Sequence, residues 1–410
     1  MRKRALLMAM ATACISLVLP VSAQAQRGRQ PVELPDGPGR ELVRTACAEC
    51  HRLNPIVNSG GYTREGWNDL IASMVDLPAE QGEVVTGYLA THFPVRPALE
   101  AVLIPGETRV SIREWLLPSL GSRPHDPLAA RDGSVWWTGQ WSSKLGRLSP
   151  STGAMTEYWL PDDSGPHGLA EDAAGNVWFT GISQNYIGML NPKTRAVTAY
   201  PLSEGRGPHT PIFDQNGTLW FTMQSGMVGR LIPATGDMRI MATPTANTYP
   251  YGIVVNSKGV PWYVDFRGNR IGRVDPDTME IQEFTLPDPD ARPRRIAITP
   301  DDVIWYTDYA RGYLGRFDPV TGAVREWASP GGPESRPYGI ATVGNVVWYS
   351  ESSVRPNTLV RFDIETERFQ TWVIPSGGGV VRNMMATANG DLVLACSAVN
   401  RVALVEVGNE

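Results

Sequence analysis

The sequence predicts a mainly β protein, a seven-bladed β-propeller that is preceded by a small all-α domain. A phrase of β-branched and aromatic residues around a tryptophan recurs at intervals of 42 to 45 residues, and Gly-Asn and Asp-Gly turns lie between the copies. This period and these residue types are typical of a propeller with four strands per blade. Six copies keep the tryptophan and a worn seventh copy has valine there: Trp136, Trp178, Trp220, Trp262, Trp305, Trp348 and Val393.

Each repeat is expected to supply four strands. In the second repeat the innermost strand follows Pro166, and the next strand contains Trp178. The last repeat stops after its third strand, at residues 402–407, and therefore lacks an outer strand. Residues 110–118 precede the first blade and resemble an outer strand, so we expect them to pair with the last blade and close the ring, which removes two open sheet edges. The repeated tryptophans are expected to pack in the cores between blades.

Residues 1–25 have the features of a secretory signal peptide. Residues 2–4 are basic, residues 5–19 are apolar, and residues 23–25 read Ala-Gln-Ala, an A-x-A cleavage site. We expect cleavage after Ala25 and export to the periplasm. No other stretch is long and apolar enough to span a membrane.

The charge balance argues against a nucleic-acid partner. Without the signal the chain has 34 basic and 42 acidic residues. A nucleic-acid-binding protein needs a concentrated basic face instead.

Cys47, Cys50 and His51 form a C-x-x-C-H motif, which attaches c-type haem. Two thiols at this spacing reach the two vinyl groups of one porphyrin, and the adjoining imidazole becomes the proximal iron ligand. A bare C-x-x-C pair is also compatible with a redox dithiol or half of a zinc site. The following histidine, the export signal and the absence of a second pair favour one covalent haem c.

The residues around this motif predict three helices, at about 39–48, 63–75 and 78–93. Between residues 35 and 100 two further side chains are candidates for the distal iron ligand, Met74 and His92. Met74 is favoured because it lies on the apolar face of its helix, which a buried haem would meet. Ligation by methionine raises the reduction potential relative to two histidines.

The chain therefore divides into a cytochrome c-like haem domain with its linker at residues 26–100 and a propeller at residues 101–410. The first of these resembles the cytochrome c domains that are attached to periplasmic quinohaemoprotein dehydrogenases. A proline-rich link at residues 93–106 is expected to be stiff and extended, and to hold the haem domain beside the blades.

The position after each entry proline begins an innermost strand, so these residues are expected to surround the central tunnel. In chain order they are His125, His167, His209, Tyr251, Arg294, Tyr338 and, after Val381 in place of a proline, Arg382. The second strand is antiparallel to the first, so its last residue returns to the same tunnel mouth. Those residues are Gly139, Gly181, Met223, Asp265, Asp308, Glu351 and Cys396.

Polar residues at this mouth have two interpretations. They line a wet tunnel, or they form a ligand site. Three imidazoles at one structural position can hold zinc, copper or iron. Alternatively, His125, His167 and His209 act as general bases, while the carboxylates bind magnesium or another divalent ion: Asp265, Asp308 and Glu351.

The repeat, with its Pro-His-Gly entry, Trp-Phe-Thr strand and Ile-Gly-Arg strand, resembles the virginiamycin B lyase (streptogramin B lyase) family over residues 109–408. The resemblance implies a seven-bladed propeller that opens a cyclic depsipeptide at an ester by magnesium-assisted elimination. It implies His167 as the base, and Glu351 as a metal ligand with Asp265 and Asp308 as shorter substitutes.

These observations favour an exported haem oxidoreductase in which a substrate or metal at the propeller axis is coupled to electron transfer through the haem. It would need an electron-transfer partner, soluble or in a membrane, and a small-molecule or peptide substrate. The alternatives are a magnesium-dependent carbon–oxygen lyase on a cyclic depsipeptide or ester, and a non-catalytic protein that docks a partner and exchanges electrons with it.

Overall fold

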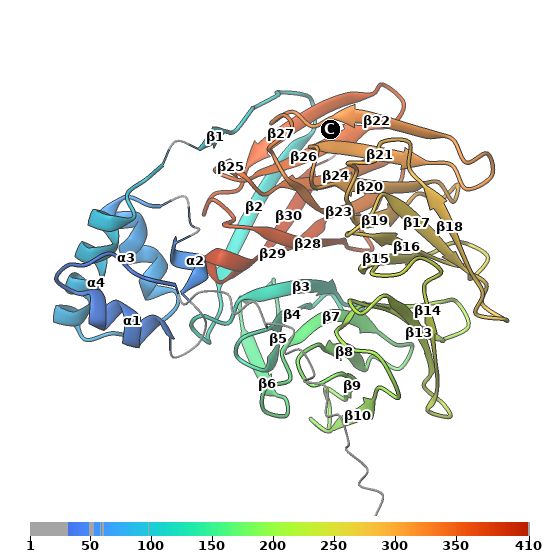
Figure 1. Ribbon diagram of the computed structural model, residues 1–410, viewed down its shortest axis with the longest axis horizontal. Coiled ribbons are helices and arrows are strands. Elements are labelled where there is room, and N and C mark those ends of the chain that lie inside the picture. Colours follow the sequence, from blue (N-terminus) through green and yellow to red (C-terminus); the bar gives the residue numbers. More distant parts are fainter. Residues whose placement is uncertain (1–31, 49–52, 58, 60, 97, 409–410) are drawn as a thin grey trace, which may run out of the picture.

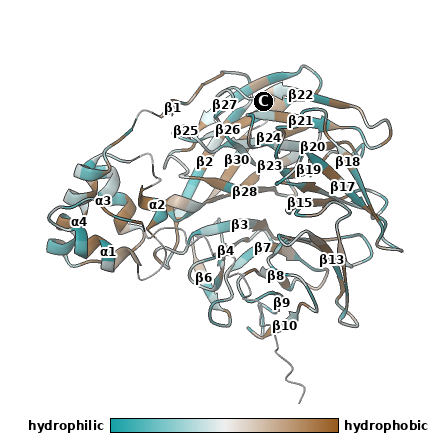
Figure 2. Cartoon of the chain, in the orientation of Figure 1, coloured by the Kyte–Doolittle hydropathy of each residue, from teal (hydrophilic) through white to brown (hydrophobic). Residues whose placement is uncertain are grey.

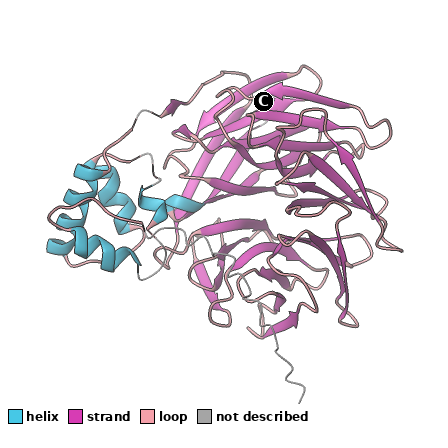
Figure 3. Ribbon diagram, viewed as in Figure 1, coloured by secondary structure: helices cyan, strands magenta, loops and turns pink. Residues whose placement is uncertain are grey.

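The computed structural model describes residues 32–48, 53–57, 59, 61–96 and 98–408. A small group of helices lies at one side of a ring of β-sheets (Figures 1 and 3). The predicted signal peptide, and the Cys50 and His51 positions of the haem motif, lie outside the described residues.

Seven four-stranded antiparallel sheets form the ring, which confirms the predicted propeller. In the first three blades the strands follow the chain order from the axis outward. They are β3 (Pro124–Ala129), β4 (Val135–Gly139), β5 (Lys144–Leu148) and β6 (Met155–Trp159); β7 (Pro166–Glu171), β8 (Val177–Gly181), β9 (Tyr186–Leu190) and β10 (Val197–Pro201); β11 (Pro208–Phe213), β12 (Leu219–Met223), β13 (Met227–Ile232) and β14 (Asp237–Ala242).

The next three blades repeat this order. Their strands are β15 (Pro250–Val255), β16 (Pro261–Asp265), β17 (Arg270–Val274) and β18 (Ile281–Thr285); β19 (Pro293–Ile298), β20 (Ile304–Asp308), β21 (Tyr313–Phe317) and β22 (Val324–Ala328); β23 (Pro337–Val343), β24 (Val346–Glu351), β26 (Thr358–Asp363) and β27 (Arg368–Val373).

The seventh blade is completed by a strand from the other end of the propeller segment. Its own strands are β28 (Val381–Ala386), β29 (Leu392–Cys396) and β30 (Arg401–Gly408), and the short 3-10 helix η1 (Ser397–Val399) joins the last two. The outer strand is β2 (Arg109–Leu116), which pairs antiparallel with β30 along its whole length. This pairing confirms the predicted closure of the ring.

A buried threonine hydroxyl links each of several blades to the next. The hydroxyl of Thr180, one residue before the end of β8, accepts the backbone N–H of Gly168 at 2.9 Å and donates to the carbonyl of His209 in the following blade at 2.8 Å. The same two bonds recur at four equivalent hydroxyl residues: Thr138, Thr222, Thr307 and Ser350. The Trp-aromatic-Thr phrase therefore encodes contacts between blades as well as core packing.

The tryptophans of the repeat are buried between the blades, as predicted. Trp178, Trp305 and Trp348 are each at most 2% exposed. Trp305 belongs to a cluster with Leu314 and Val347, and its ring stacks on Trp327 at 5.5 Å between centroids. These residues fill the space between two neighbouring sheets.

The helical part contains α1 (Arg40–Ala48), α2 (Asn54–Val57), α3 (Arg64–Ala72) and α4 (Ala79–His92). The three long helices lie close to where the sequence predicts them, whereas the short α2 was not predicted. The helix predicted at 63–75 ends at Ala72, so Met74 lies in the turn after α3 and not on its apolar face. Trp67 is 3% exposed at the centre of their core, and its indole donates to the carbonyl of Phe93 at 2.9 Å. Of the helices in the described ranges, none has the length and apolar character needed to cross a membrane.

The helices are fixed to the propeller by backbone contacts. After α4 the link runs along the edge of the sixth blade, where β1 (Leu99–Glu100) pairs in parallel with β25 (Val354–Arg355) (Figure 1). On the other side of the helices, the carbonyl of Ser73 accepts the N–H of Gly121 at 3.0 Å and the side-chain amide of Asn400 at 3.1 Å. The short α2, which ends with Ile56 and Val57, lies on the side of the helices that faces the blades (Figure 2).

We predict that Trp305→Ala lowers the free energy of unfolding by about 3–5 kcal/mol, because it leaves a cavity between two sheets. Trp159→Ala is the control. Trp159 is 72% exposed and contacts Lys144 across its ring, so its loss should cost less than about 1 kcal/mol. Chemical denaturation of both variants measures this difference, and equal losses would contradict the assignment of Trp305 to the core.

Candidate functional site: the propeller mouth and the helical pocket

The structure brings the three predicted histidines into one row at the start of neighbouring innermost strands. The ring centroids of His125 and His167 lie 3.5 Å apart, and those of His167 and His209 lie 3.9 Å apart. Tyr251 continues the row, with its ring 3.8 Å from that of His209. The sequence repeat placed these residues at equivalent positions, and the fold makes them neighbours.

A backbone irregularity directs these side chains toward the axis. In β7 the pairing with β8 shifts register between Pro166 and Leu169. A register shift also follows the first residue of every other innermost strand, which is a proline except for Val381 in the seventh blade. Such bulges re-aim side chains and often lie beside functional sites.

The other half of the row combines tyrosines with arginines. The hydroxyl groups of Tyr251 and Tyr338 lie 2.6 Å apart, and the guanidinium of Arg294 lies 3.7 Å from the centroid of the Tyr338 ring. Burial opposes ionisation of Tyr338, but Arg294, Arg382 and Arg295 lower its pKa to about 8. For Tyr251 burial is the stronger influence and raises the pKa.

The surroundings of the three imidazoles favour their neutral form. Burial holds the pKa of His125 well below its ordinary value, and the charges of Arg382 and Arg295 lower it further. Burial likewise lowers the pKa values of His167 and His209. Nδ1 of His167 and Nε2 of His209 are buried without a hydrogen-bond partner in the described residues.

The predicted carboxylates do not join the histidines. The oxygen atoms of Asp265 accept backbone N–H groups of Tyr249 and Arg267 in the adjoining loops. One oxygen of Asp308 accepts the backbone N–H of Arg292, and the other forms an ion pair with the guanidinium of Arg311. The expectation that they face the mouth fails because these loops need acceptors for their buried N–H groups.

Glu351 has a similar structural role in the sixth blade. One of its oxygens accepts the hydroxyl of Ser329 at 2.5 Å and the N–H of Gly331 at 2.6 Å, and the other accepts the hydroxyl of Thr358 at 2.6 Å. It is fully buried. The structure therefore gives the three carboxylates no shared ion site.

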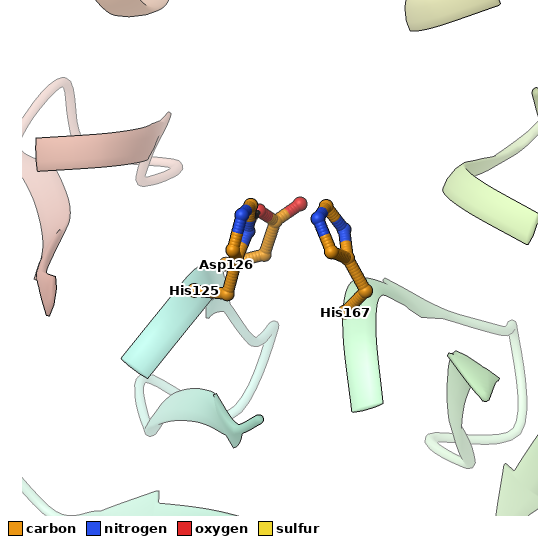
Figure 4. Close-up of side chains that lie close together, drawn as sticks. All are labelled: His125, Asp126 and His167. Atoms are coloured by element: carbon orange, nitrogen blue, oxygen red, sulfur yellow. Dashed lines mark hydrogen bonds and ion pairs between the residues drawn. The ribbon is translucent and has the colours of Figure 1, made fainter. Parts of the chain in front are cut away.

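A carboxylate that the sequence analysis missed lies beside two of the imidazoles (Figure 4). Within the described residues, one group of His, Cys, Asp or Glu side chains is close enough to hold a metal ion: His125, Asp126 and His167 (Figure 4). An oxygen of Asp126 lies 2.8 Å from Nδ1 of His125 and accepts Arg295 at 2.7 Å. Its other oxygen accepts the amide of Asn383 at 3.0 Å. Both oxygens are thus already bonded.

These bonds cross the tunnel and close it. Arg295 comes from the fifth blade, reaches Asp126 in the first and also donates to Thr210 in the third at 3.2 Å. Arg295 and Asp126 are each 2% exposed. We call this set, with Asn383, the axial plug. The position that follows each ring residue was the available sequence signal, because it holds a charged or polar residue in four blades: Asp126, Thr210, Arg295 and Asn383.

Above the axial plug lies a cavity of about 790 Å³, which we call the propeller mouth. Its wall contains His125, His167 and Tyr251 together with six arginines: Arg123, Arg267, Arg292, Arg294, Arg336 and Arg382. Burial and the neighbouring Arg382 lower the pKa of Arg123 to about 9, which leaves it charged at neutral pH. A volume of this size is typical of small-molecule sites.

A second, mostly apolar cavity lies among the helices, and we call it the helical pocket. Cys47 and Met74 are both in its wall, together with Trp67 and Leu70, and none of the described residues that line it is charged. His92 lies elsewhere, with its ring 4.4 Å from that of Tyr88. Of the two candidate distal ligands, Met74 is thus the one that shares a cavity with Cys47.

A small cavity, the bridging cavity, lies between the helical pocket and the propeller mouth. Met74 and Trp141 line both it and the helical pocket. Arg123 and Arg382 line both it and the propeller mouth. The three cavities are therefore adjacent and share side chains.

The fold and the mouth define a seven-bladed propeller with a ligand-sized cavity at one end of a closed tunnel. The chain belongs to the virginiamycin B lyase family, whose model matches residues 106–355. No curated protein sequence matches the chain.

Solved structures agree with this fold. A streptogramin B lyase structure is 25% identical, with a TM-score of 0.67 over 73% of this chain and 98% of that one. A catalytically inactive histidine-to-alanine variant of virginiamycin B lyase from Staphylococcus aureus, solved with quinupristin, is 24% identical over 72% and 99% of the two chains, with a TM-score of 0.66. Hydrazine synthase of Kuenenia stuttgartiensis shares the fold at 11% identity, covering 70% and 96% of the two chains with a TM-score of 0.60.

We predict that one tyrosine of the protein ionises near pH 8, because three arginines favour the phenolate of Tyr338. Ordinary tyrosines ionise at about pH 10. The phenolate absorbance should therefore rise in two steps with pH, and Tyr338→Phe should remove the first step. Tyr263→Phe is the control, since burial raises the pKa of Tyr263. An unchanged first step in Tyr338→Phe would contradict the assignment.

Proposed function

We propose that this protein is an exported c-type haem protein in which a ligand at the propeller mouth is coupled to electron transfer through the haem. The observation that supports this best is the row of three adjacent cavities, from the wall with Cys47 and Met74 to the ring of histidines and arginines. A redox partner outside the cytoplasm would exchange electrons with it.

The residues of the helical pocket fit a haem. Its wall is apolar, as a buried macrocycle requires, and Cys47 lies in it. Cys47 and Cys50 would hold the porphyrin as thioethers, with His51 and Met74 as iron ligands. When bound, the group supplies exchange of single electrons. The chain's own contribution is to bury the pocket under Gly121 and other propeller residues.

The residues of the bridging cavity supply the coupling. Arg382 lies in the walls of both the bridging cavity and the propeller mouth, and its Nε donates to Ser397 at 2.9 Å. Trp141 lies in the walls of the bridging cavity and the helical pocket, and the guanidinium of Arg123 lies 4.7 Å from its ring centroid. A change of charge in the mouth would therefore act on the helical pocket through the side chains that line the bridging cavity.

We predict that Cys47→Ala loses one thioether bond, and that Met74→Ala loses the sulfur-to-iron charge-transfer band while its haem remains covalent. A pyridine haemochrome spectrum measures the first change and the near-infrared spectrum measures the second. His92→Ala is the control and should change neither spectrum, because His92 does not line the pocket. A normal two-thioether spectrum in Cys47→Ala would refute the haem assignment.

We predict that Arg382→Gln lowers the haem reduction potential, because a nearby positive charge favours the reduced state, which carries one positive charge less. A spectroelectrochemical titration measures the shift. Arg325→Gln is the control, since Arg325 lies on the outer strand of the fifth blade and pairs with Glu367. Equal potentials in wild type and Arg382→Gln would mean that the mouth and the haem are not coupled.

The family also suggests a carbon–oxygen lyase that acts on a cyclic depsipeptide or ester. His167 is in place for a base, but the carboxylates proposed as magnesium ligands bond to loops instead: Asp265, Asp308 and Glu351. Magnesium-dependent ring opening of a streptogramin B, detected by chromatography with fragmentation, would favour this alternative. Electron transfer that survives simultaneous replacement of His125, His167 and His209 would favour a docking protein without catalysis.

A further inference from the structure

We propose that the propeller mouth binds an organic oxyanion, a carboxylate or phosphate ester that carries a planar apolar group. This inference names the ligand class of the site in the proposed function and rests on the assignment of that mouth as a binding site. It differs from the metal that the histidines alone suggest.

The charge of the wall supports an anion. Six arginines line the mouth, and within the described part of the chain no carboxylate lines it. Of these arginines, only Arg336 forms an ion pair with a described residue, Glu334, and Glu334 is exposed. Arg123 donates to Gln140, and Arg382 donates to a hydroxyl group. The described side chains that line the cavity therefore carry a net positive charge.

Among these arginines, Arg294 packs against several aromatic rings of the wall. Its guanidinium lies 3.7 Å from the ring centroid of Tyr338, 4.2 Å from that of Tyr309 and 4.5 Å from that of Phe266. Its Nε is buried without a partner in the described residues. Aromatic faces stabilise the guanidinium only in part, because they accept no full hydrogen bond. An oxyanion would accept the hydrogen bonds that the guanidinium of Arg294 still lacks.

The imidazole side of the mouth offers a neutral donor. His167 is 3% exposed, lines the cavity, and its Nδ1 has no partner among the described residues. Burial and the charges around it keep the ring neutral, so one of its nitrogens carries a proton that it can donate to an oxyanion. A cation at the same place would meet the charges of Arg123, Arg294 and Arg382.

The rings beside the arginines indicate the rest of the ligand. Tyr249, Phe266 and Tyr309 line the same cavity, and the ring centroids of Phe266 and Tyr309 lie 5.8 Å apart, edge to face. Flat aromatic surfaces favour planar apolar groups. The mouth therefore combines arginines for the oxyanion with aromatic rings for the remainder, and the axial plug blocks passage through the tunnel.

Isothermal titration calorimetry of the full mature protein tests the proposal with inorganic phosphate, benzoate, acetate, Zn²⁺ and Mg²⁺ as probes. We expect phosphate and benzoate to bind, benzoate more tightly than acetate, with affinities that fall as salt is raised. Arg294→Gln should weaken phosphate about tenfold or more, and Arg336→Gln, at a more exposed position, should weaken it less. Arg325→Gln is the matched control and should bind like wild type.

Binding of Zn²⁺ or Mg²⁺ without binding of either oxyanion would overturn the proposal, as would equal affinities in wild type and both mouth variants. Benzoate no tighter than acetate would overturn the planar group. Thermal melting shows whether each variant is folded. If Arg294→Gln is not folded, the phosphate affinity of Arg336→Gln tests the proposal instead. Calorimetry measures oxyanion binding without reference to the haem, so the two proposals can fail separately. If the oxyanions bind but Arg382→Gln leaves the haem reduction potential unchanged, the coupling is refuted and this inference stands.

Discussion

The propeller mouth depends on two hydrogen bonds made by a hydroxyl group near the end of the second strand of a blade. By accepting an N–H within its own blade and donating to a carbonyl of the next, Thr180 fixes both the bulge that turns His167 inward and the place of His209. A buried N–H without an acceptor is costly, so the bulge needs this partner. Val264 and Ala395 replace the hydroxyl in the fourth and seventh blades. In the last blade, Ser397 donates to the carbonyl of Pro124 and so bonds to the first blade.

The repeat period was sufficient to predict the blades, because each copy carries its own turns and core residues. It also predicted that His125, His167 and His209 would be neighbours, since equivalent positions in adjacent blades lie side by side around an axis. The axial plug could not be predicted in this way. Arg295 and Asp126 are 169 residues apart, and their pairing depends on the width of the tunnel, which the spacing of the repeat does not specify.

The carboxylates show a second limit of the sequence pattern. A strand position predicts the face at which a residue lies, but not whether its side chain turns to the cavity or to the loop behind it. Asp265 and Asp308 end their strands at the predicted mouth, yet the loop N–H groups take their oxygens. The helices were predictable from apolar spacing, whereas the contacts of Ser73 with Gly121 and Asn400 required the folded propeller.

The pairing of β2 with β30 places the first and last parts of the propeller segment on adjacent strands, with Arg109 opposite Gly408. During synthesis residues 109–116 emerge long before residues 401–408, so the ring stays open until β30 has been made. A chain that stops early leaves an unpaired edge on β29 and a loose β2 strand, and both are templates for aggregation. Synthesis of β30 is thus the step that pairs both of these edges and closes the ring.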